Sequence, residues 1–390
     1  MKFVAKLQPR FSTSINRRSA LGLGLILGSS VFQKRASSQS AQRDDAFVPL
    51  PSYQSLLEMI RQRGHSFRVI GAAPDLSPLV LVKAGGSKKP SIVISGGAHA
   101  TEHAGVVAAV ELIDRLKTDH EVWIVPSRDP IGLSGFRHAL SLGLGESPNI
   151  TNVEEAEQLM REKGEVLVDR DDLLIVRIGE YGYANRGLYR KIDKGAKILD
   201  ALRGRRIYFP SRTDDLPGAG PLERAYTLIV TLDGEVLHLN RFHDTLWAPA
   251  EVQAIRKVLA DVQPGLTFDL HEHERGGFFW MSARRQRTEQ DEIWERRMAH
   301  AAIAAVAAGG AELAADAYSP GDFFERLERG VYWLDPSKRG EGLNFADFAS
   351  AKYGPSFTIE SGMKGPFEQR VRQHLTVVQT AVSIFEERFA

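Results

Sequence analysis

Short apolar runs alternate with segments of helical periodicity along most of the chain, starting at Phe47. Apolar runs of four to eight residues that end at Gly or Pro are typical of buried strands, and apolar residues spaced three and four apart are typical of helices that cover a sheet. The pattern predicts strands at 67–71, 79–84, 90–97, 121–127, 227–232, 266–270 and 356–359. It predicts helices at 53–62, 104–116, 249–262, 291–308 and 367–389. Buried strands that alternate with helices favour a layered α/β fold with a mostly parallel or mixed sheet.

The stretch from His138 to Arg224 interrupts this pattern. It is rich in Gly, Arg, Asp and Glu, and its clearest helical segment is 153–165. We therefore predict a long insertion at about 138–224 that decorates the sheet and shapes the mouth of a cleft. The 390 residues suffice for one large α/β domain or two smaller ones, and no further linker rich in Pro or Gly is present. We expect one catalytic domain over 45–390.

The N-terminal 41 residues have the pattern of an export signal. A basic region ends at Arg17-Arg18, an apolar stretch covers 20–32, and small and polar residues follow up to Ala41. The apolar stretch is short for a membrane span, and the Arg pair resembles a twin-arginine signal. We expect cleavage near Ser40, a periplasmic or secreted protein, and no stable membrane anchor after removal of the signal. A disordered basic tail is the alternative.

Charge and cysteine content narrow the partners and the metal ligands. The formal net charge is +1, but seven Lys and Arg residues and no acidic residue precede Ala41, so the remainder carries about −6. This balance gives no electrostatic support to a nucleic-acid partner. The chain has no Cys, so any metal must be held by His, Asp or Glu.

Four short motifs, distant in the chain, place reactive side chains at expected strand ends. They are GGAHATEH at 96–103, HLNR at 238–241, DLHEH at 269–273 and FTIES at 357–361. A glycine-ended strand puts His99 in a loop and Glu102 in the first turn of a helix, where the H-x-x-E spacing lets both reach one ion. His271 at another strand end can supply a third ligand. Two imidazoles and one carboxylate suit zinc and leave a position open for water.

With these motifs in this order, the chain resembles the zinc carboxypeptidases of the carboxypeptidase A type and their relatives, the aspartoacylases and succinylglutamate desuccinylases. The resemblance touches much of 90–362 and is dense only at the four motifs. It implies a three-layer α/β/α fold around a central twisted sheet. It also implies that one Zn²⁺ ion is held by His99, Glu102 and His271.

The same resemblance assigns roles to four further residues. Glu360 ends a short apolar strand and matches the family's general base, which takes a proton from the metal-activated water and passes it to the leaving amine. Asn240-Arg241 matches the dipeptide that grips the substrate's carboxylate, and a guanidinium makes paired charge-assisted bonds to such a group. Arg137 matches the arginine that polarises the scissile carbonyl.

Two positions depart from the family pattern. His238 stands where the family has an Asp that orients a zinc-bound histidine, so Asp269 or a backbone carbonyl takes that role, or the metal is held more weakly. Asp129 replaces an Asn that is usual ahead of the carbonyl-polarising arginine. A catalytic tyrosine is expected before the general base, and Tyr332 is the candidate.

Two other ligand sets remain open. HATEH at 99–103 also matches the inverted zinc-protease motif H-x-x-E-H, in which His99 and His103 both bind the metal from one helix and a distant Glu such as Glu180 completes the set. The preceding glycine pair argues for a turn rather than a helix at His99. His273 is a second candidate for the third ligand, although it lies further into the following loop.

These residues together predict an exported zinc-dependent hydrolase that removes C-terminal residues from peptides by metal-activated water. The alternative is an amidohydrolase that acts on N-acyl amino acids with the same zinc site. In either case the expected partner is a peptide or N-acyl amino acid with a free carboxylate. A non-catalytic protein that captures such peptides is a third possibility, against which Glu360 and the complete ligand set argue.

Overall fold

The computed structural model describes residues 46–170, 172–188, 192–211, 220, 222–274, 276–283, 288–319 and 321–390. By its internal contacts the chain divides into Met1–Asp45 and Ala46–Ala390. The expected export signal lies outside the described residues. Within the described part of the chain, no helix is both long enough and apolar enough to cross a membrane.

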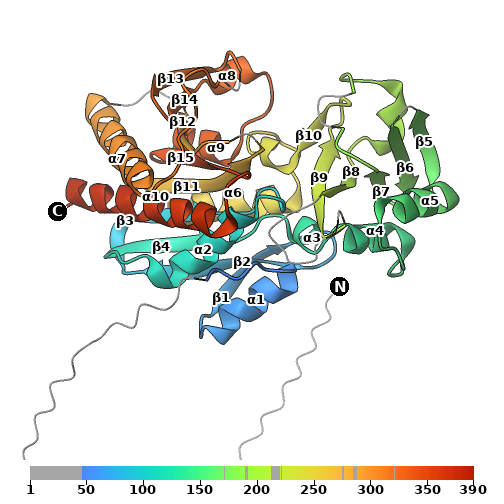
Figure 1. The fold of residues 1–390 in the computed structure, drawn as a ribbon, viewed down its shortest axis with the longest axis horizontal. Coiled ribbons are helices and arrows are strands. Elements are labelled where there is room, and N and C mark those ends of the chain that lie inside the picture. Colours follow the sequence, from blue (N-terminus) through green and yellow to red (C-terminus); the bar gives the residue numbers. More distant parts are fainter. Residues whose placement is uncertain are drawn as a thin grey trace, which may run out of the picture. The chain divides into compact units, whose positions relative to one another are not determined.

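A nine-stranded mixed sheet forms the centre of Ala46–Ala390 (Figure 1). In spatial order its strands are β1 (Phe67–Ala72), β2 (Pro78–Gly85), β4 (His120–Val125), β3 (Lys88–Ser95), β11 (Leu266–His273), β15 (Ser356–Gly362), β12 (Phe279–Ala283), β14 (Val331–Leu334) and β13 (Phe324–Glu328). The neighbours β4–β3, β3–β11, β11–β15 and β12–β14 are parallel, and the other pairs are antiparallel. The predicted mixed sheet is confirmed. Because β3, β11 and β15 are parallel neighbours, their carboxyl ends meet at one edge.

Helices cover both faces of this sheet, which confirms the predicted α/β/α layers. One core joins the strands to α1 (Tyr53–Gln62), α2 (His103–Arg115), α7 (Glu289–Ala308) and α10 (Phe367–Arg388). A second core joins them to α6 (Ala250–Val262) and α9 (Phe345–Lys352). Successive residues of a strand point to opposite faces. Accordingly, Ile92 and Ile94 belong to the first core and Val93 to the second.

Helix boundaries agree with the sequence pattern where the apolar repeat is long. The helix predicted at 53–62 is α1, which begins after Ser52, whose hydroxyl accepts a hydrogen bond from the Ser55 amide. The eight-residue helix α9 was not predicted. It begins with a reciprocal pair in which Asn344 and Asp347 each cap the other's backbone amide. Strands β12 and β14 were also missed, because runs of five and four residues carry little periodicity.

A second sheet of six strands lies in the region predicted as an insertion. Its spatial order is β10 (Val236–His238), β9 (Arg224–Val230), β8 (Arg206–Ser211), β7 (Tyr181–Ala184), β6 (Leu173–Ile178) and β5 (Glu165–Arg170). The helices α3 (Pro130–Leu133), α4 (Phe136–Leu144) and α5 (Val153–Lys163) pack with it into a core of its own. The sheet continues past Arg224 to His238, so its last strand delivers the 238–241 motif.

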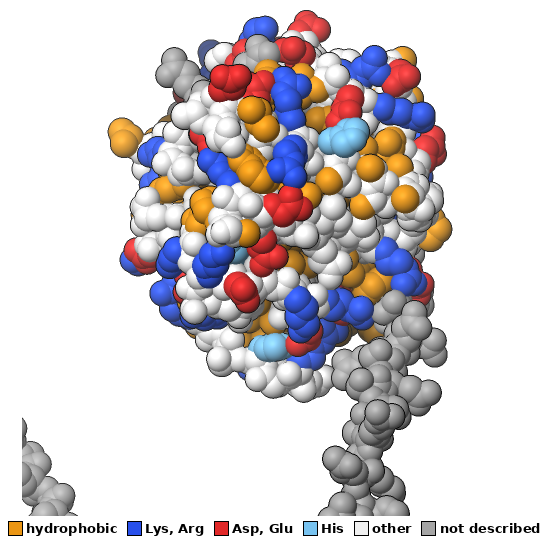
Figure 2. Space-filling view, turned by 90° about the vertical axis from the view of Figure 1, so that its left-hand side faces the viewer, with side chains coloured by type: hydrophobic (Ala, Val, Ile, Leu, Met, Phe, Trp, Pro, Cys, Tyr) orange, Lys and Arg blue, Asp and Glu red, His pale blue; other side chains and the backbone are white. Residues whose placement is uncertain are grey.

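The outer layer of helices α7 and α10 is joined at its surface by ion pairs. Arg297 and Glu387 lie 2.6 Å apart, as do Arg388 and Asp291. Exposed pairs of this kind contribute little to stability, so the buried apolar contacts hold these helices. Figure 2 shows a face of the molecule on which acidic and basic side chains are intermixed with hydrophobic ones.

Asp129 is a buried carboxyl group at the start of α3. Its Oδ1 accepts from the Gly132 amide at 2.9 Å, and its Oδ2 accepts from the Thr227 hydroxyl at 2.8 Å. Burial raises the pKa of Asp129 to about 7, although both hydrogen bonds oppose this shift. The residue therefore caps a helix of the fold and does not line the metal pocket described below.

We expect the Asp129→Asn variant to be more stable than the wild type at pH 8. A carboxyl group whose pKa is raised by folding stabilises the native state at low pH, and this contribution is lost as the pH rises toward 7. The difference in unfolding free energy should grow by about 1.4 kcal/mol per pH unit between roughly pH 4 and 7. Chemical unfolding at several pH values measures it. Asp261→Asn, on the exposed side of α6, is the control, and a difference that is constant with pH contradicts the prediction.

Candidate metal centre

The turn after β3 delivers the first two candidate ligands. Gly97 has a φ of 57°, and a Cβ on it would lie 2.8 Å from the Ser127 hydroxyl, so glycine is needed for the turn. His99 follows in the loop, and Glu102 occupies the N-cap position of α2. The Glu102 side chain makes no capping hydrogen bond to the helix, which leaves its carboxylate for the two histidines.

The third candidate ligand lies beside the candidate base on neighbouring strands. β11 and β15 are parallel, and His271 is paired in register with Glu360. Residues paired in this way project from the same face of the sheet. β3 runs along the other side of β11, so the loop that follows β3 brings His99 and Glu102 over the same face.

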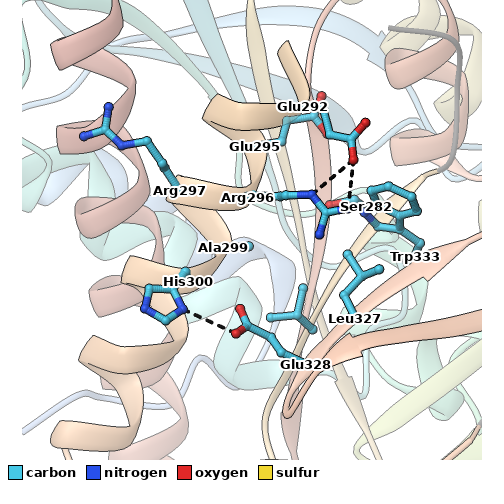
Figure 3. Close-up of a pocket in the computed structure, with 11 residues that line it drawn as sticks. Ser282, Glu292, Glu295, Arg296, Arg297, Ala299, His300, Leu327, Glu328 and Trp333 are labelled. Carbon is cyan, nitrogen blue, oxygen red and sulfur yellow. Dashed lines mark hydrogen bonds and ion pairs between the residues drawn. The ribbon is translucent and has the colours of Figure 1, made fainter. Parts of the chain in front are cut away.

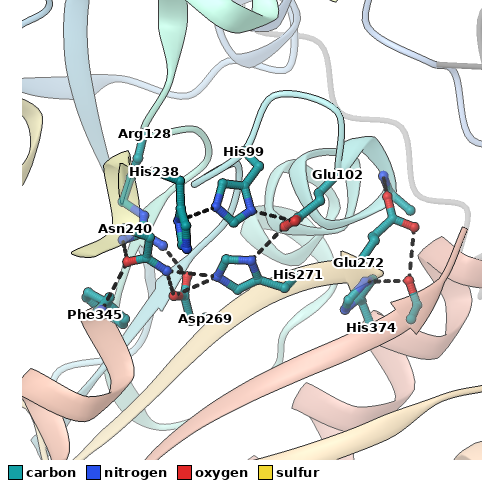
Figure 4. Close-up of polar contacts among 12 residues, drawn as sticks. His99, Glu102, Arg128, His238, Asn240, Asp269, His271, Glu272, Phe345 and His374 are labelled. Atoms are coloured by element: carbon teal, nitrogen blue, oxygen red, sulfur yellow. Dashed lines mark hydrogen bonds and ion pairs between the residues drawn. The ribbon is translucent and has the colours of Figure 1, made fainter. Parts of the chain in front are cut away.

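The three candidate ligands converge on one point (Figure 4). Glu102 Oε1 lies 2.5 Å from His99 Nδ1, and Glu102 Oε2 lies 2.6 Å from His271 Nδ1. One ligand atom from each of the three buried residues lies within 4.8 Å of the others, and no other such group occurs in the described part of the chain. Two imidazoles and a carboxylate form a donor set that zinc accepts, with a coordination position left for water. The residues present therefore fit the expected metal.

The outward nitrogen of each histidine has its own partner. His271 Nε2 lies 2.9 Å from Asp269 Oδ2, and His99 Nε2 lies 2.8 Å from His238 Nδ1. Burial and the nearby Arg241 cation lower the pKa of His238 well below its usual value. His238 is therefore neutral, and its Nδ1 can accept a hydrogen bond from the N–H of His99 Nε2. His238 thus orients one candidate ligand, and Asp269 orients the other.

A buried network behind His271 contains Asn240 and an arginine that the sequence analysis missed. Arg128 donates to Asn240 Oδ1 at 2.9 Å and to Asp269 Oδ1 at 2.5 Å. Asn240 Oδ1 also accepts from the Phe345 amide, and its Nδ2 lies 3.1 Å from Asp269 Oδ2. Burial opposes ionisation of Asp269, but the Arg128 and His271 charges prevail and lower its pKa below the usual range. The network holds an ionised Asp269 against His271.

Glu272, next to the candidate ligand His271, connects three elements from the other face of β11. Its Oε2 accepts from the Ala104 amide of α2 at 2.7 Å, and its Oε1 accepts from the Ser361 hydroxyl at 3.0 Å. Its Oε1 also pairs with the Arg370 guanidinium of α10. These buried charge-assisted contacts fix β11 and β15 relative to the helix that carries Glu102.

Glu360 faces the triad from β15 and is suited to proton transfer. Its Oε2 is buried and has no hydrogen-bond partner among the described residues. Burial raises the pKa of Glu360 to about 8, while the His271 charge acts in the opposite direction. A cation held by the triad would favour the ionised carboxylate that a general base requires.

Asn240 and Arg241 line the pocket, but both already have partners within the protein. Asn240 is 2% exposed, and both ends of its amide are hydrogen-bonded in the network described above. The Nε of Arg241 donates to Glu341 Oε2 at 2.7 Å, and its Nη1 donates to the Asn240 carbonyl at 2.9 Å. Arg241, which was expected to bind a substrate carboxylate, is thus paired with a carboxylate of the protein itself. Asn240 is part of the hydrogen-bond network behind His271.

Arg137 does not lie in the pocket, so its expected role at the scissile carbonyl is not supported. It belongs to α4, its side chain is 49% exposed, and it pairs with Glu223, 3.6 Å away. The reason is topological, because the chain turns into α3 and α4 toward the second sheet after β4. The arginine near the site is Arg128, three residues after the end of β4. Its position at the end of the strand predicted at 121–127 was the signal available in the sequence.

The structure also separates the alternative ligands from the triad. His103 Nε2 accepts from the Leu50 amide at 2.7 Å, and its Nδ1 lies 3.4 Å from the buried Arg224 guanidinium. His273 Nε2 lies 2.7 Å from the Gly277 carbonyl oxygen. Neither histidine joins the group of converging ligand atoms. Glu180 pairs with Arg205 in the second sheet, away from the triad.

The triad and Glu360 open into a cavity of about 250 Å³. One part of its wall is polar and contains the residues described above. The other part is apolar and is made by Met281, Phe323, Phe324 and Leu334. Tyr332 does not line it, since its side chain is buried in the sheet and its hydroxyl donates to the Tyr318 carbonyl at 3.2 Å. The candidate catalytic tyrosine is thus not at this site.

A larger pocket of about 360 Å³ lies on the opposite face of the same strands (Figure 3). Ser282 and Trp333 line it, whereas their chain neighbours Met281 and Leu334 line the metal pocket. Arg296 lies over the Trp333 ring at 4.9 Å and pairs with Glu292 at 2.8 Å. The described residues of this pocket include no group of converging metal ligands.

Comparisons with known proteins give structural likeness only. No protein-family model matches the sequence, and no curated protein matches it. Similar solved structures include a metallo-carboxypeptidase from Burkholderia cenocepacia, with 14% identity, a TM-score of 0.46, and coverage of 87% of this chain and 69% of that one. Bovine thrombin-activatable fibrinolysis inhibitor matches with 14% identity and a TM-score of 0.44, over 88% of this chain and 99% of that one. At these values the likeness assigns no activity and no residue role to this chain.

Proposed function

We propose that this chain is an exported, zinc-dependent hydrolase of peptide or related amide bonds. The observation that supports this most is the convergence of His99, Glu102 and His271 beside Glu360 in one cavity. The donor set suits zinc, and the neighbouring carboxylate has an oxygen with no hydrogen-bond partner among the described residues. Export is proposed from the N-terminal sequence alone, with its Arg17-Arg18 pair and short apolar stretch.

The chain's own residues divide the chemistry between them. Zinc held by the triad would supply a Lewis acid that acidifies a water molecule and polarises the amide carbonyl. Glu360 is placed to take a proton from the attacking water and to give it to the leaving nitrogen. The C–N bond then breaks into an acid and an amine, and water is the only co-reactant. His238 and Asp269 hold the two imidazoles in the orientation that exposes both Nδ1 atoms to the metal.

The triad is common to two reactions, and the size of the cavity bears on the choice between them. Removal of single C-terminal residues from peptides is the reaction expected from the resemblance. Deacylation of N-acyl amino acids is the second candidate. A cavity of about 250 Å³ is small for a binding site and favours one short side chain or acyl group beside the reacting bond.

A mixed peptide pool tests the proposed activity. The purified zinc-loaded chain is incubated with the pool, with and without a chelator, and the product masses are followed. Chelator-sensitive appearance of shortened peptides is the expected result, and the mass differences report which residues leave. The hydrolase proposal is contradicted if neither the peptide pool nor a panel of N-acyl amino acids is cleaved.

A further inference from the structure

Arg241, which lines the metal pocket where the sequence predicts a receptor for a substrate carboxylate, forms an ion pair with Glu341, which does not line that pocket. Arg241 Nε lies 2.7 Å from Glu341 Oε2. The two side chains are only 15% and 9% exposed, so solvent screens the pair weakly. The guanidinium that would receive an anion therefore already has an anionic neighbour within the protein.

The segment that carries Glu341 is held firmly against the 240–244 segment. A Cβ on Gly342 would lie 2.1 Å from the Arg241 carbonyl oxygen, so the two backbones touch. The Leu343 amide donates to Asp244 Oδ1 at 2.8 Å, and the Leu343 carbonyl accepts from the His243 amide at 3.2 Å. These contacts hold the segment, and Glu341 with it, beside Arg241.

The other cations at the pocket are balanced in the same way. Arg339 lines the cavity and lies 2.6 Å from Asp347, with 2% and 1% of the two side chains exposed. Arg128 behind the wall is paired with Asp269. A zinc ion would in turn be offset by the carboxylates of Glu102 and Glu360. No guanidinium among the described lining residues is left without an acidic partner, so a further carboxylate would enter a site with no surplus positive charge.

A carboxylate in the cavity would be attracted by Arg241 but repelled by the adjacent Glu341, so the pair attracts it far less than Arg241 alone would. Its loss of hydration would then be uncompensated. We propose that Glu341 is the specificity-determining residue of this site. By neutralising Arg241 it selects amide substrates whose leaving side is neutral, such as an amide-capped residue or a continuing chain, over substrates with a free carboxylate there. This inference rests on the proposed hydrolase function and names its substrate class.

Ligand binding tests this inference without relying on turnover. N-acetylalanine and N-acetylalaninamide carry a short side chain and differ only in the terminal acid or amide, and calorimetry gives the Kd of each for the zinc-loaded chain. We expect the wild type to bind the acid no more tightly than the amide. The Glu341→Gln variant, which keeps the size of the side chain, should bind the acid at least tenfold more tightly than the wild type does. The double variant Glu341→Gln with Arg241→Gln should lose that gain, because the freed guanidinium produces it.

Glu341→Asp is the matched control, since it keeps the charge and should keep the wild-type ratio of the two Kd values. The inference is overturned if the wild type prefers the acid tenfold or more, or if Glu341→Gln leaves the ratio unchanged. It is also overturned if the gain survives in the double variant, since the carboxylate would then be bound elsewhere. Failure of the hydrolase proposal is seen separately, as absence of chelator-sensitive cleavage of both the peptide pool and the N-acyl amino acids.

Discussion

Replacing Glu360 with Gln is expected to lower kcat by a factor of about 10²–10⁴, the range that a positioned general acid–base contributes. Glu360 lies in register with His271 and presents an oxygen without a hydrogen-bond partner among the described residues. The amide of Gln has nearly the same shape but cannot accept the proton of the attacking water. Steady-state kinetics on a peptide that the pool experiment identifies measures the effect.

Zinc binding separates a chemical role of Glu360 from a structural one. Because Glu360 is not among the converging ligand atoms, Glu360→Gln should keep its affinity for zinc within a few-fold of the wild type. Glu328→Gln, on the exposed edge strand β13, controls for the substitution itself. If Glu360→Gln retains full turnover, the assignment of the base is wrong.

Removing one imidazole from the triad is expected to abolish zinc binding at micromolar concentrations. His271→Ala leaves two ligands, His99 and Glu102, and removes one of the partners of the buried Asp269. Bound zinc should stabilise the wild type by about 4 kcal/mol at a free concentration of 1,000 times Kd. We therefore expect zinc to raise the Tm of the wild type and to leave that of His271→Ala unchanged. Competition with a chromophoric chelator gives the affinity.

Two further variants test which histidines belong to the site. His300→Ala removes an exposed histidine of α7 and should leave the zinc-dependent rise in Tm intact. His273→Ala removes the alternative third ligand, whose Nε2 faces the Gly277 carbonyl, and should also retain it. Loss of the rise in His273→Ala, with retention in His271→Ala, would reverse the assignment of the third ligand.

Local patterns were sufficient for the elements that form the centre of the fold. Strands β3, β11 and β15 are β-branched or apolar runs long enough to be recognised, and α1 was predicted with the observed boundaries. The motifs at the ends of these strands could be recognised because the residues of each motif lie only a few positions apart in the sequence. Gly97, His99 and Glu102 lie within one turn, and a glycine-ended strand admits few other geometries. The short elements α9, β12 and β14 were missed, because their stability comes from neighbours distant in the chain.

The sequence could not predict contacts between side chains that are distant in the chain. His238 reaches His99 only because β10 closes the second sheet and returns the chain to the pocket. Arg137 matches a family motif, but α4 carries it away from the triad. Arg128 and Asn240 meet Asp269 across separations of more than a hundred and of 29 residues. The spacing of residues within one motif gives no information about contacts between different motifs.

The sequence by itself determined the class of fold, the residue types available to a metal and the strand ends at which they stand, because hydrophobic periodicity and local turns act over a few residues. Tertiary structure decided which of these side chains meet and in what charge state. It paired Arg241 with Glu341, which is 100 residues away in the chain, and so placed an acidic neighbour beside the expected carboxylate receptor. The physical reason is that Coulomb interactions and burial depend on distance in space, and only the folded chain sets that distance.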